Sequence, residues 1–276
     1  MDLTGYLDDL NEKAAFVFKR EEGDYEKDGL LYCGKCHTPK QGVQDFFGIV
    51  SIPCQCRTAI MEAEQAKRDA ERRAEHIKRL RREAFPDPRM ATWTFEKDDG
   101  ANPVSLAMKK YAEDFDTVKW EPINGFVLYG PTGTGKTFLA ACVANRLIDR
   151  CVPVLMTSID RIRSELDQHR GERQEYIDDL AQVPFLVLDD LAAESHDSRT
   201  QELVFAVINA RAQSGRPMII TSNITAAELK NPTNAASKRV FSRILGMCLP
   251  VEIKGDDRRI NTLRSGAKTL MDIVGL

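Results

Sequence analysis

The sequence predicts an α/β fold in which a parallel β-sheet is covered by helices on both faces. Four short apolar runs indicate the strands, and the segments between them are long enough for crossover helices. The runs are GFVLYG, VPVLMTS, PFLVLDD and PMIITSN, which begin at residues 125, 152, 184 and 217. They are continuously apolar, which is typical of strands in a parallel sheet buried on both sides.

Size and composition place this sheet in a chain of roughly two domains. The chain has 276 residues, and 42% of them are hydrophobic, which is enough for a sizeable core. The formal net charge of −3 excludes a surface that is wholly a nucleic-acid patch, so any such contact must be local. The sequence has no apolar run long enough for a membrane helix, and its acidic start lacks the apolar core of a secretory signal. We therefore expect a cytoplasmic protein with reduced thiols and no membrane partner.

The N-terminal part of the chain contains two close pairs of cysteines. Cys33 and Cys36 lie in CGKC, and Cys54 and Cys56 lie in CQC. Four thiolates from two such pairs can close one tetrahedral site around a structural Zn²⁺, so we expect a zinc-binding module. The C-x-C spacing of the second pair is less usual, and His37 is an alternative ligand beside Cys36. The other interpretation is two unrelated pairs of reduced cysteines.

A charged stretch separates the cysteines from the apolar runs. Residues 57–83 contain no glycine or proline, and FPDP then ends the helical pattern. Between residues 67 and 82, eight basic side chains stand against three acidic ones. We expect a module at 1–60, a helical linker at 61–88 and the main domain at 89–276. The helix is either a solvated linker with i,i+4 ion pairs or a docking surface for phosphates or an acidic partner.

A glycine-rich loop, GPTGTGKT, follows the first apolar run and precedes a helical pattern. This context is typical of a loop whose backbone N–H groups converge on phosphate oxygens, with a lysine at the β/γ-phosphates and a hydroxyl on Mg²⁺. We therefore expect ATP and Mg²⁺ as cofactors. The expected nucleotide-binding residues are Gly130, Pro131, Thr132, Gly133, Thr134, Gly135, Lys136 and Thr137.

Polar residues end the third and fourth apolar runs. Because the carboxyl ends of parallel strands meet at one edge of a sheet, Asp189, Asp190 and Asn223 are expected beside the phosphates. Asp189 is the expected partner of Thr137 in holding Mg²⁺, and Asp190 is the expected base that orients the attacking water. Asn223 either positions the same water or caps a turn.

The acidic pair and the Asn-terminated strand, in this order after the glycine-rich loop, resemble the AAA+ ATPases. Together with RVFSRI, these segments are similar to the helicase-loader branch, the DnaC/DnaI-like proteins, and to their transposition relatives of the IstB type. The likeness covers roughly residues 90–259. It implies an AAA+ P-loop domain with a five-stranded parallel sheet and an abbreviated or absent C-terminal lid. It also implies self-association, with ATP held between neighbouring subunits.

The resemblance assigns roles to three arginines. Arg243 matches the arginine finger that reaches the γ-phosphate of a neighbour's ATP, and Arg239, one helical turn before it, is the second candidate. The other interpretation is that both are surface arginines on a solvated helix. Arg259, in GDDRR, matches a nucleotide-sensing arginine.

The resemblance implies ATP-dependent loading of a replicative DnaB-type helicase hexamer onto single-stranded DNA, with the zinc module on the helicase. Residues 192–202 and 168–174 are the candidate DNA contacts. One alternative is an IstB-like transposition helper ATPase that binds duplex DNA. Another is a nucleotide-switch adaptor with little hydrolysis, because most AAA+ proteins carry Glu where this chain has Asp190, and the shorter side chain is expected to slow hydrolysis.

Overall fold

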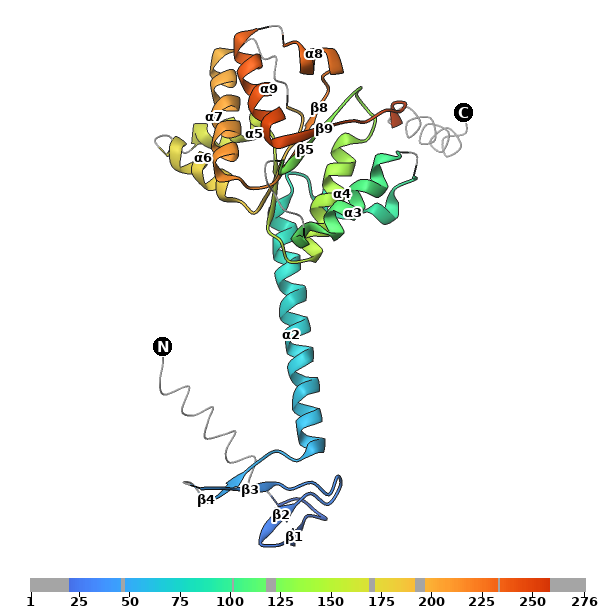
Figure 1. The fold of residues 1–276 in the computed structure, drawn as a ribbon, viewed down its shortest axis with the longest axis vertical. Coiled ribbons are helices and arrows are strands. Elements are labelled where there is room, and N and C mark those ends of the chain that lie inside the picture. The colour runs from blue at the N-terminus through green and yellow to red at the C-terminus, as the bar shows by residue number, and fades with distance from the viewer. Residues whose placement is uncertain are drawn as a thin grey trace, which may run out of the picture. The chain divides into compact units, whose positions relative to one another are not determined.

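The computed structural model describes residues 20–45, 48–100, 102–117, 123–168, 172–191, 197–232 and 234–258. The chain divides into two compact units, Met1–Ala74 and Glu75–Leu276 (Figure 1). The boundary falls inside helix α2 (Gln55–Ala84), which covers most of the predicted linker. None of the helices in the described ranges combines the length and the apolar character needed to cross a membrane.

The first unit contains two short antiparallel hairpins and the N-terminal part of α2. Strand β1 (Tyr25–Lys27) pairs with β2 (Leu30–Tyr32), and β3 (Gln41–Gln44) pairs with β4 (Gly48–Ser51). A buried ion pair supports these hairpins, since Lys40 Nζ lies 2.5 Å from Asp24 Oδ2. The other carboxylate oxygen of Asp24 accepts a hydrogen bond from the backbone N–H of Gly34. So small a unit has little apolar core, and polar contacts of this kind therefore matter more.

The second unit contains the predicted sheet. Its strands are β5 (Gly125–Tyr129), β6 (Val154–Thr157), β7 (Phe185–Leu188), β8 (Met218–Ser222) and β9 (Cys248–Glu252). Their order is β6-β7-β8-β5-β9, and every neighbouring pair is parallel. The prediction of a five-stranded parallel sheet is confirmed. The four apolar runs correspond to the first four strands, whereas β9 lies at the sheet edge with Leu249 and Pro250 exposed and therefore lacks a continuous apolar signal.

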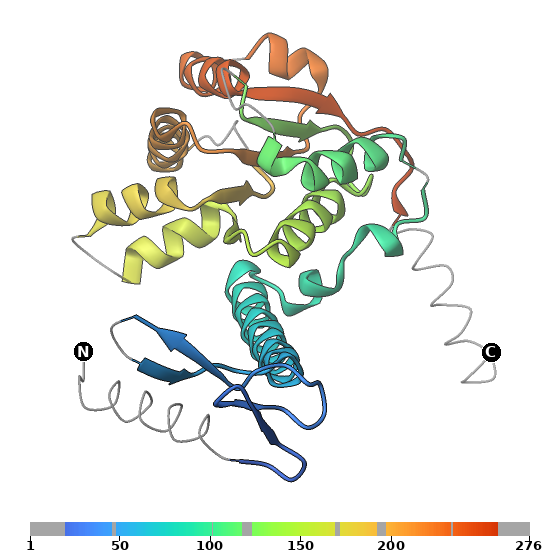
Figure 2. The same cartoon turned by 60° about the horizontal axis from the view of Figure 1, so that its bottom comes forward.

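Helices cover both faces of this sheet (Figures 1 and 2). They are α3 (Val104–Glu113), α4 (Lys136–Asp149), α5 (Ile159–Gln168), α6 (Arg173–Gln182), α7 (Ser198–Ser214), α8 (Ala226–Lys230) and α9 (Ala235–Met247). Three short 3₁₀ segments precede β5, namely η1 (Pro88–Thr92), η2 (Phe95–Lys97) and η3 (Phe115–Thr117).

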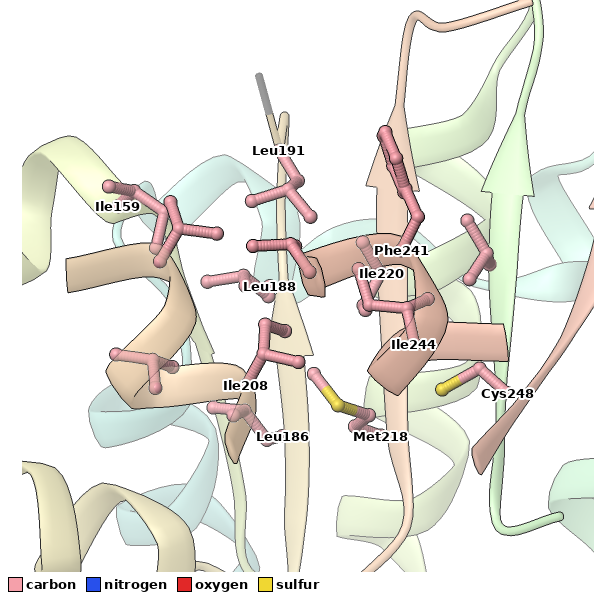
Figure 3. Close-up of a cluster of buried hydrophobic side chains, with 14 of the residues drawn as sticks. Ile159, Leu186, Leu188, Leu191, Ile208, Met218, Ile220, Phe241, Ile244 and Cys248 are labelled. Atoms are coloured by element: carbon pink, nitrogen blue, oxygen red, sulfur yellow. The ribbon is translucent and has the colours of Figure 1, made fainter. Parts of the chain in front are cut away.

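Successive residues of each strand face opposite cores. Leu186 and Leu188 of β7 pack with Ile220 of β8 against helices that include α5, α7 and α9 (Figure 3). Phe185 and Val187, which alternate with them, belong to the second core with α3 and α4. Both faces of the central strands are therefore covered by apolar side chains. Polar residues follow only where these strands end, at their carboxyl edge.

The C-terminal end of α2 belongs to the second unit. Leu80 and Ala84 are buried in the core that includes α3 and α4, and Arg81 pairs with Asp149 of α4. The segment after α2 is also anchored to α4, because Asn145 Nδ2 donates to the carbonyl of Met90 at 2.8 Å. This end of the charged helix is therefore a packed structural element.

Candidate nucleotide and metal sites

The glycine-rich loop connects the central strand β5 to the start of α4. Its glycines adopt left-handed backbone angles, with φ of 134° at Gly130, 80° at Gly133 and 95° at Gly135. At Gly130 a side chain is also excluded by space, since a Cβ would lie 2.6 Å from the carbonyl oxygen of Ile253. The loop thus needs glycine for both its curvature and its close packing. Gly135 is the N-cap of α4, so the free N–H groups of that helix open toward the loop.

Lys136 places its charge inside this loop. The residue is only 6% exposed, and its ammonium donates to the carbonyls of Gly130 at 2.8 Å and Pro131 at 2.6 Å. Thr134, also buried, donates its hydroxyl to Pro131 at 2.9 Å. A buried ammonium at a helix N-terminus makes this loop a strong site for a polyanion.

The two predicted magnesium ligands lie together. Thr137 lies close enough to Asp189 to lower the pKa of its carboxylate, and Thr221 Oγ1 donates to Asp189 Oδ1 at 2.6 Å. Burial raises the pKa of Asp189, the contacts with Thr221 and Thr137 oppose this rise, and the charge of Asp190 adds to it. A buried carboxylate beside a hydroxyl is a donor set that suits Mg²⁺, and the cation would favour the ionised form. The residues present therefore fit the ion.

Asp190 and Asn223 are also brought together. Asn223 Nδ2 donates to Asp190 Oδ1 at 2.8 Å. Asp190 has a φ of 51°, which is unusual for a residue other than glycine, and its backbone N–H donates to Thr221 Oγ1 at 2.8 Å. The structure therefore brings these two predicted residues together, and the water-positioning role of Asn223 stays a prediction.

The four predicted zinc ligands form one cluster in the first unit. The sulfurs of Cys33, Cys36, Cys54 and Cys56 all lie within 4.8 Å of one another, with Cys33 and Cys54 buried. The Sγ–Sγ distances are 3.5 Å from Cys33 to Cys56 and 3.3 Å from Cys54 to Cys56. Four Zn–S bonds of about 2.3 Å in a tetrahedron need sulfurs about 3.8 Å apart, so the cluster fits Zn²⁺ after small shifts.

The chemistry of the cluster calls for a cation. The sulfurs of Cys54, Cys33 and Cys36 around Cys56 raise the pKa of its thiol to about 12. A bound Zn²⁺ would supply the positive charge that lets all four cysteines bind as thiolates. His37 does not join the group. Its ring lies 5.8 Å from the ring of Tyr25, and the cluster is complete without it.

Asp257 and Arg258, for which the sequence predicted no role, lie against the glycine-rich loop. The backbone N–H of Arg258 donates to the carbonyl of Gly133 at 3.1 Å. The Asp257 carboxylate lies so close that a Cβ on Gly133 would be 1.9 Å from its Oδ1. The Arg258 guanidinium lies 3.2 Å from Asp99 and 3.6 Å from Asp98. The sequence predicted a role for Arg259, which lies outside the described residues, but not for its neighbours in the same GDDRR segment.

Comparison with known proteins agrees with this geometry. Residues 55–266 match the family described as IstB-like ATP binding protein. The chain belongs to this family. The replicative helicase loader DnaI of Bacillus subtilis is 29% identical over 183 residues, which are 60% of this chain and 58% of that protein. A Mycobacterium tuberculosis protein described as an ATP-binding protein in an insertion sequence is 33% identical over 174 residues, 60% of this chain and 64% of that protein.

A solved structure gives the same family assignment. The crystal structure of DnaI matches with a TM-score of 0.53 and 28% identity, covering 65% of this chain and 99% of that chain. The resemblance to the DnaC/DnaI-like branch and its IstB-type relatives is therefore confirmed, as is the AAA+ fold. The matched region spans less than two thirds of the length of the curated relatives named above.

As an IstB-like protein, the chain presents its two candidate trans-acting arginines on α9. Arg239 and Arg243 are both exposed, and the guanidinium of Arg239 lies 4.5 Å from the ring centre of Phe205 on α7. Among the described residues, neither guanidinium bonds to the chain's own glycine-rich loop. Their assignment as fingers stays a prediction.

The candidate DNA contacts are only partly described in this IstB-like chain. Residues 192–196 and 169–171 lie outside the described ranges. Ser198 and Arg199 are exposed at the start of α7, which Asp197 caps by accepting hydrogen bonds from Arg199 and Thr200. Their assignment as phosphate contacts stays a prediction.

Proposed function

We propose that this chain is an ATP-dependent loader of a replicative DnaB-type helicase onto single-stranded DNA, and that it works as an AAA+ oligomer that hydrolyses ATP. One observation carries the proposal. A connected set of phosphate, magnesium and water-positioning residues lies on a fold that covers 99% of the solved DnaI chain. The loader relative in Bacillus subtilis supports the choice of a helicase as the partner.

Each residue of the set has a defined task in hydrolysis. With ATP bound, the ammonium of Lys136 would turn from the loop carbonyls to the β/γ-phosphates. Thr137 and Asp189 would hold Mg²⁺, which would neutralise phosphate charge. Asp190 accepts the proton of the attacking water, and the amide of Asn223 fixes the carboxylate that does so. Because Asp190 is shorter than glutamate, we expect slow turnover that DNA or the helicase stimulates.

The arginines of α9 complete the site of a neighbouring subunit. An exposed, planar cation suits the developing charge on the phosphoryl oxygens. Arg243 has this character, whereas Arg239 already stacks on Phe205 and is the second candidate. Self-association through the ATP site is therefore part of the proposal.

The first unit supplies the helicase contact in this proposal. A structural Zn²⁺ held by the four cysteines would stabilise this unit in place of a large apolar core. On its β3–β4 hairpin, Val43 and Ile49 lie directly opposite each other and are 69% and 54% exposed. An exposed cross-strand apolar pair on a metal-stabilised module is suited to contact with another protein.

Co-elution with a purified DnaB-type hexamer tests the function. The full chain is mixed with helicase and a closed single-stranded DNA circle, with ATP, with ADP and without nucleotide, and DNA unwinding is then measured. We expect co-elution and loading with ATP. A Val43→Ser/Ile49→Ser variant loses helicase contact and keeps ATP binding, and a zinc chelator has the same effect. Failure to co-elute in every nucleotide state contradicts the proposal.

Two further candidates share the same ATP site. The 33% identity to the insertion-sequence protein of Mycobacterium tuberculosis favours an IstB-like transposition helper, for which coating of duplex DNA without helicase affinity is decisive. The aspartate at position 190 favours a nucleotide switch with little hydrolysis. Turnover that DNA stimulates and that Lys136→Ala abolishes excludes the switch.

A further inference from the structure

The end of β8 and the segment after β7 run side by side at the ATP site. Leu188 of β7 is paired with Ile220 of β8, so the residues that follow these two continue next to each other. The backbone N–H of Leu191 donates to the carbonyl of Thr221 at 2.8 Å, which extends the pairing beyond the strand. Asp189 and Asp190 therefore lie next to the residues at the end of β8, which the hydrogen-bonded pairing holds in place.

The hydroxyl of Thr221 contacts both acids. Its oxygen accepts a hydrogen bond from the backbone N–H of Asp190 at 2.8 Å and donates to Asp189 Oδ1 at 2.6 Å. A backbone N–H can only donate, and a hydroxyl has a single proton. The direction of both bonds is therefore fixed, and the proton of Thr221 points to Asp189.

Water cannot take the place of the Thr221 hydroxyl in these two hydrogen bonds. The residue is 1% exposed, so water does not compete for its hydroxyl. The terminal torsion of an aspartate is broad, and the bond to Oδ1 removes this freedom from Asp189. The Thr221 hydroxyl also accepts the backbone N–H of Asp190. The φ of Asp190 is 51°, which is unfavourable for a residue with a side chain, so this bond supports a strained backbone.

We propose that Thr221 is a positioning residue for ATP hydrolysis. Its single hydroxyl links the carboxylate of Asp189, which would hold Mg²⁺, to the backbone N–H of Asp190, and it thereby orients both acids. The inference rests on the ATPase function proposed above and names a residue that the nucleotide motifs do not include. Neighbouring Ser222 is equally buried, but its hydroxyl donates to the carbonyl of Leu191 at 2.7 Å and not to either acid. Ser222 is therefore a matched control.

The central variant is Thr221→Val, which keeps the branched shape and removes the hydroxyl. Loss of a group that orients a metal ligand typically costs about 10- to 100-fold in activity or metal affinity. We expect kcat to fall by about this factor while the KM for ATP changes by less than about threefold, and we expect half-maximal activity to need more Mg²⁺. Thr221→Ser keeps the hydroxyl and restores both quantities, whereas Ser222→Ala behaves like the parent.

ATP-binding measurements test the role of Thr221 even where no hydrolysis can be measured. A fluorescent ATP analogue is titrated into the full chain at a series of Mg²⁺ concentrations. Thr221→Val is expected to shift the Mg²⁺ dependence of binding and to leave Mg²⁺-free binding unchanged. Thr221→Ala replaces it if the valine variant does not fold. Parent-like Mg²⁺ dependence in the folded variant, or a serine variant as impaired as the valine one, overturns the inference. A parent that binds Mg²⁺-ATP but never hydrolyses it contradicts the proposed ATPase instead, and the Mg²⁺ shift still decides the role of Thr221.

Discussion

At the scale of single residues, Lys136 shows how the loop holds a charge ready for a polyanion. Its ammonium is buried and donates to the carbonyls of Gly130 and Pro131, and phosphate oxygens can replace these acceptors. Lys136→Ala removes charge-assisted bonds worth about 1.5–3 kcal/mol each, so ATP affinity should fall by at least about tenfold. Titration calorimetry measures this. Lys110→Ala, on the exposed surface of α3, is the control and should bind ATP like the parent.

The buried pair of Asp24 and Lys40 gives the first unit a pH dependence. Burial alone would raise the pKa of Asp24, but the bonds from Lys40 and from the backbone of Glu21 and Gly34 lower it from 3.8 to about 2. Because the folded pKa lies below the unfolded one, this stabilisation is complete above pH 3.8 and is lost as the pH falls toward 2.

Asp24→Asn tests that dependence. Near neutral pH it removes one charge of a buried pair and is expected to destabilise the first unit by about 3 kcal/mol. Exchange of the Gly34 amide, which donates to Asp24, measures the local effect in the full chain. The difference between parent and variant should shrink only below pH 3.8, since Asp24 is then protonated in the unfolded chain. A difference that is constant down to pH 2 contradicts the assignment.

At the scale of elements, Arg211 of α7 joins three parts of the second unit. Its guanidinium is fully buried and donates to the carbonyls of Ala181 and Val183, before β7, and of Pro217, before β8. Arg211→Leu leaves these carbonyls without the donor, at a cost of about 3 kcal/mol. Urea unfolding measures the loss, and Arg199→Leu at the exposed start of the same helix should cost less than about 0.5 kcal/mol.

The elements show where sequence patterns suffice and where they do not. The four continuous apolar runs and the spacing of the acids predicted the central strands and the meeting of Asp189, Asp190 and Asn223, since parallel strands bring their carboxyl ends to one edge. The sequence did not predict the role of Thr221, because a single threonine in a buried strand has no recognisable pattern. Its contacts with Asp189 and Asp190 depend on the pairing of β8 with β7, whose residues are distant in the sequence. The contact of Arg258 with the loop likewise depends on the return of the chain after β9.

At the scale of the whole molecule, the shared-site proposal predicts complementation between defective copies. Arg243→Ala should bind ATP like the parent and hydrolyse it at least about 100-fold more slowly, because the finger acts on a neighbour. Mixed with Lys136→Ala, which keeps Arg243, it should recover part of the turnover. Phosphate release at a series of mixing ratios measures this.

The control for this experiment is Lys238→Ala, which removes another exposed cation from the same helix and should keep parental turnover. No recovery at any ratio, together with a particle that stays monomeric in ATP and DNA, would contradict assembly through the nucleotide.

The contacts made by residues 253–258 matter for where the protein can be cut or extended. The glycine-rich loop packs against the Ile253 carbonyl and against Asp257, so the residues that support the loop continue beyond β9. A shortened version for crystallography must retain the chain through Arg258, and a purification tag fused directly there would lie beside the glycine-rich loop.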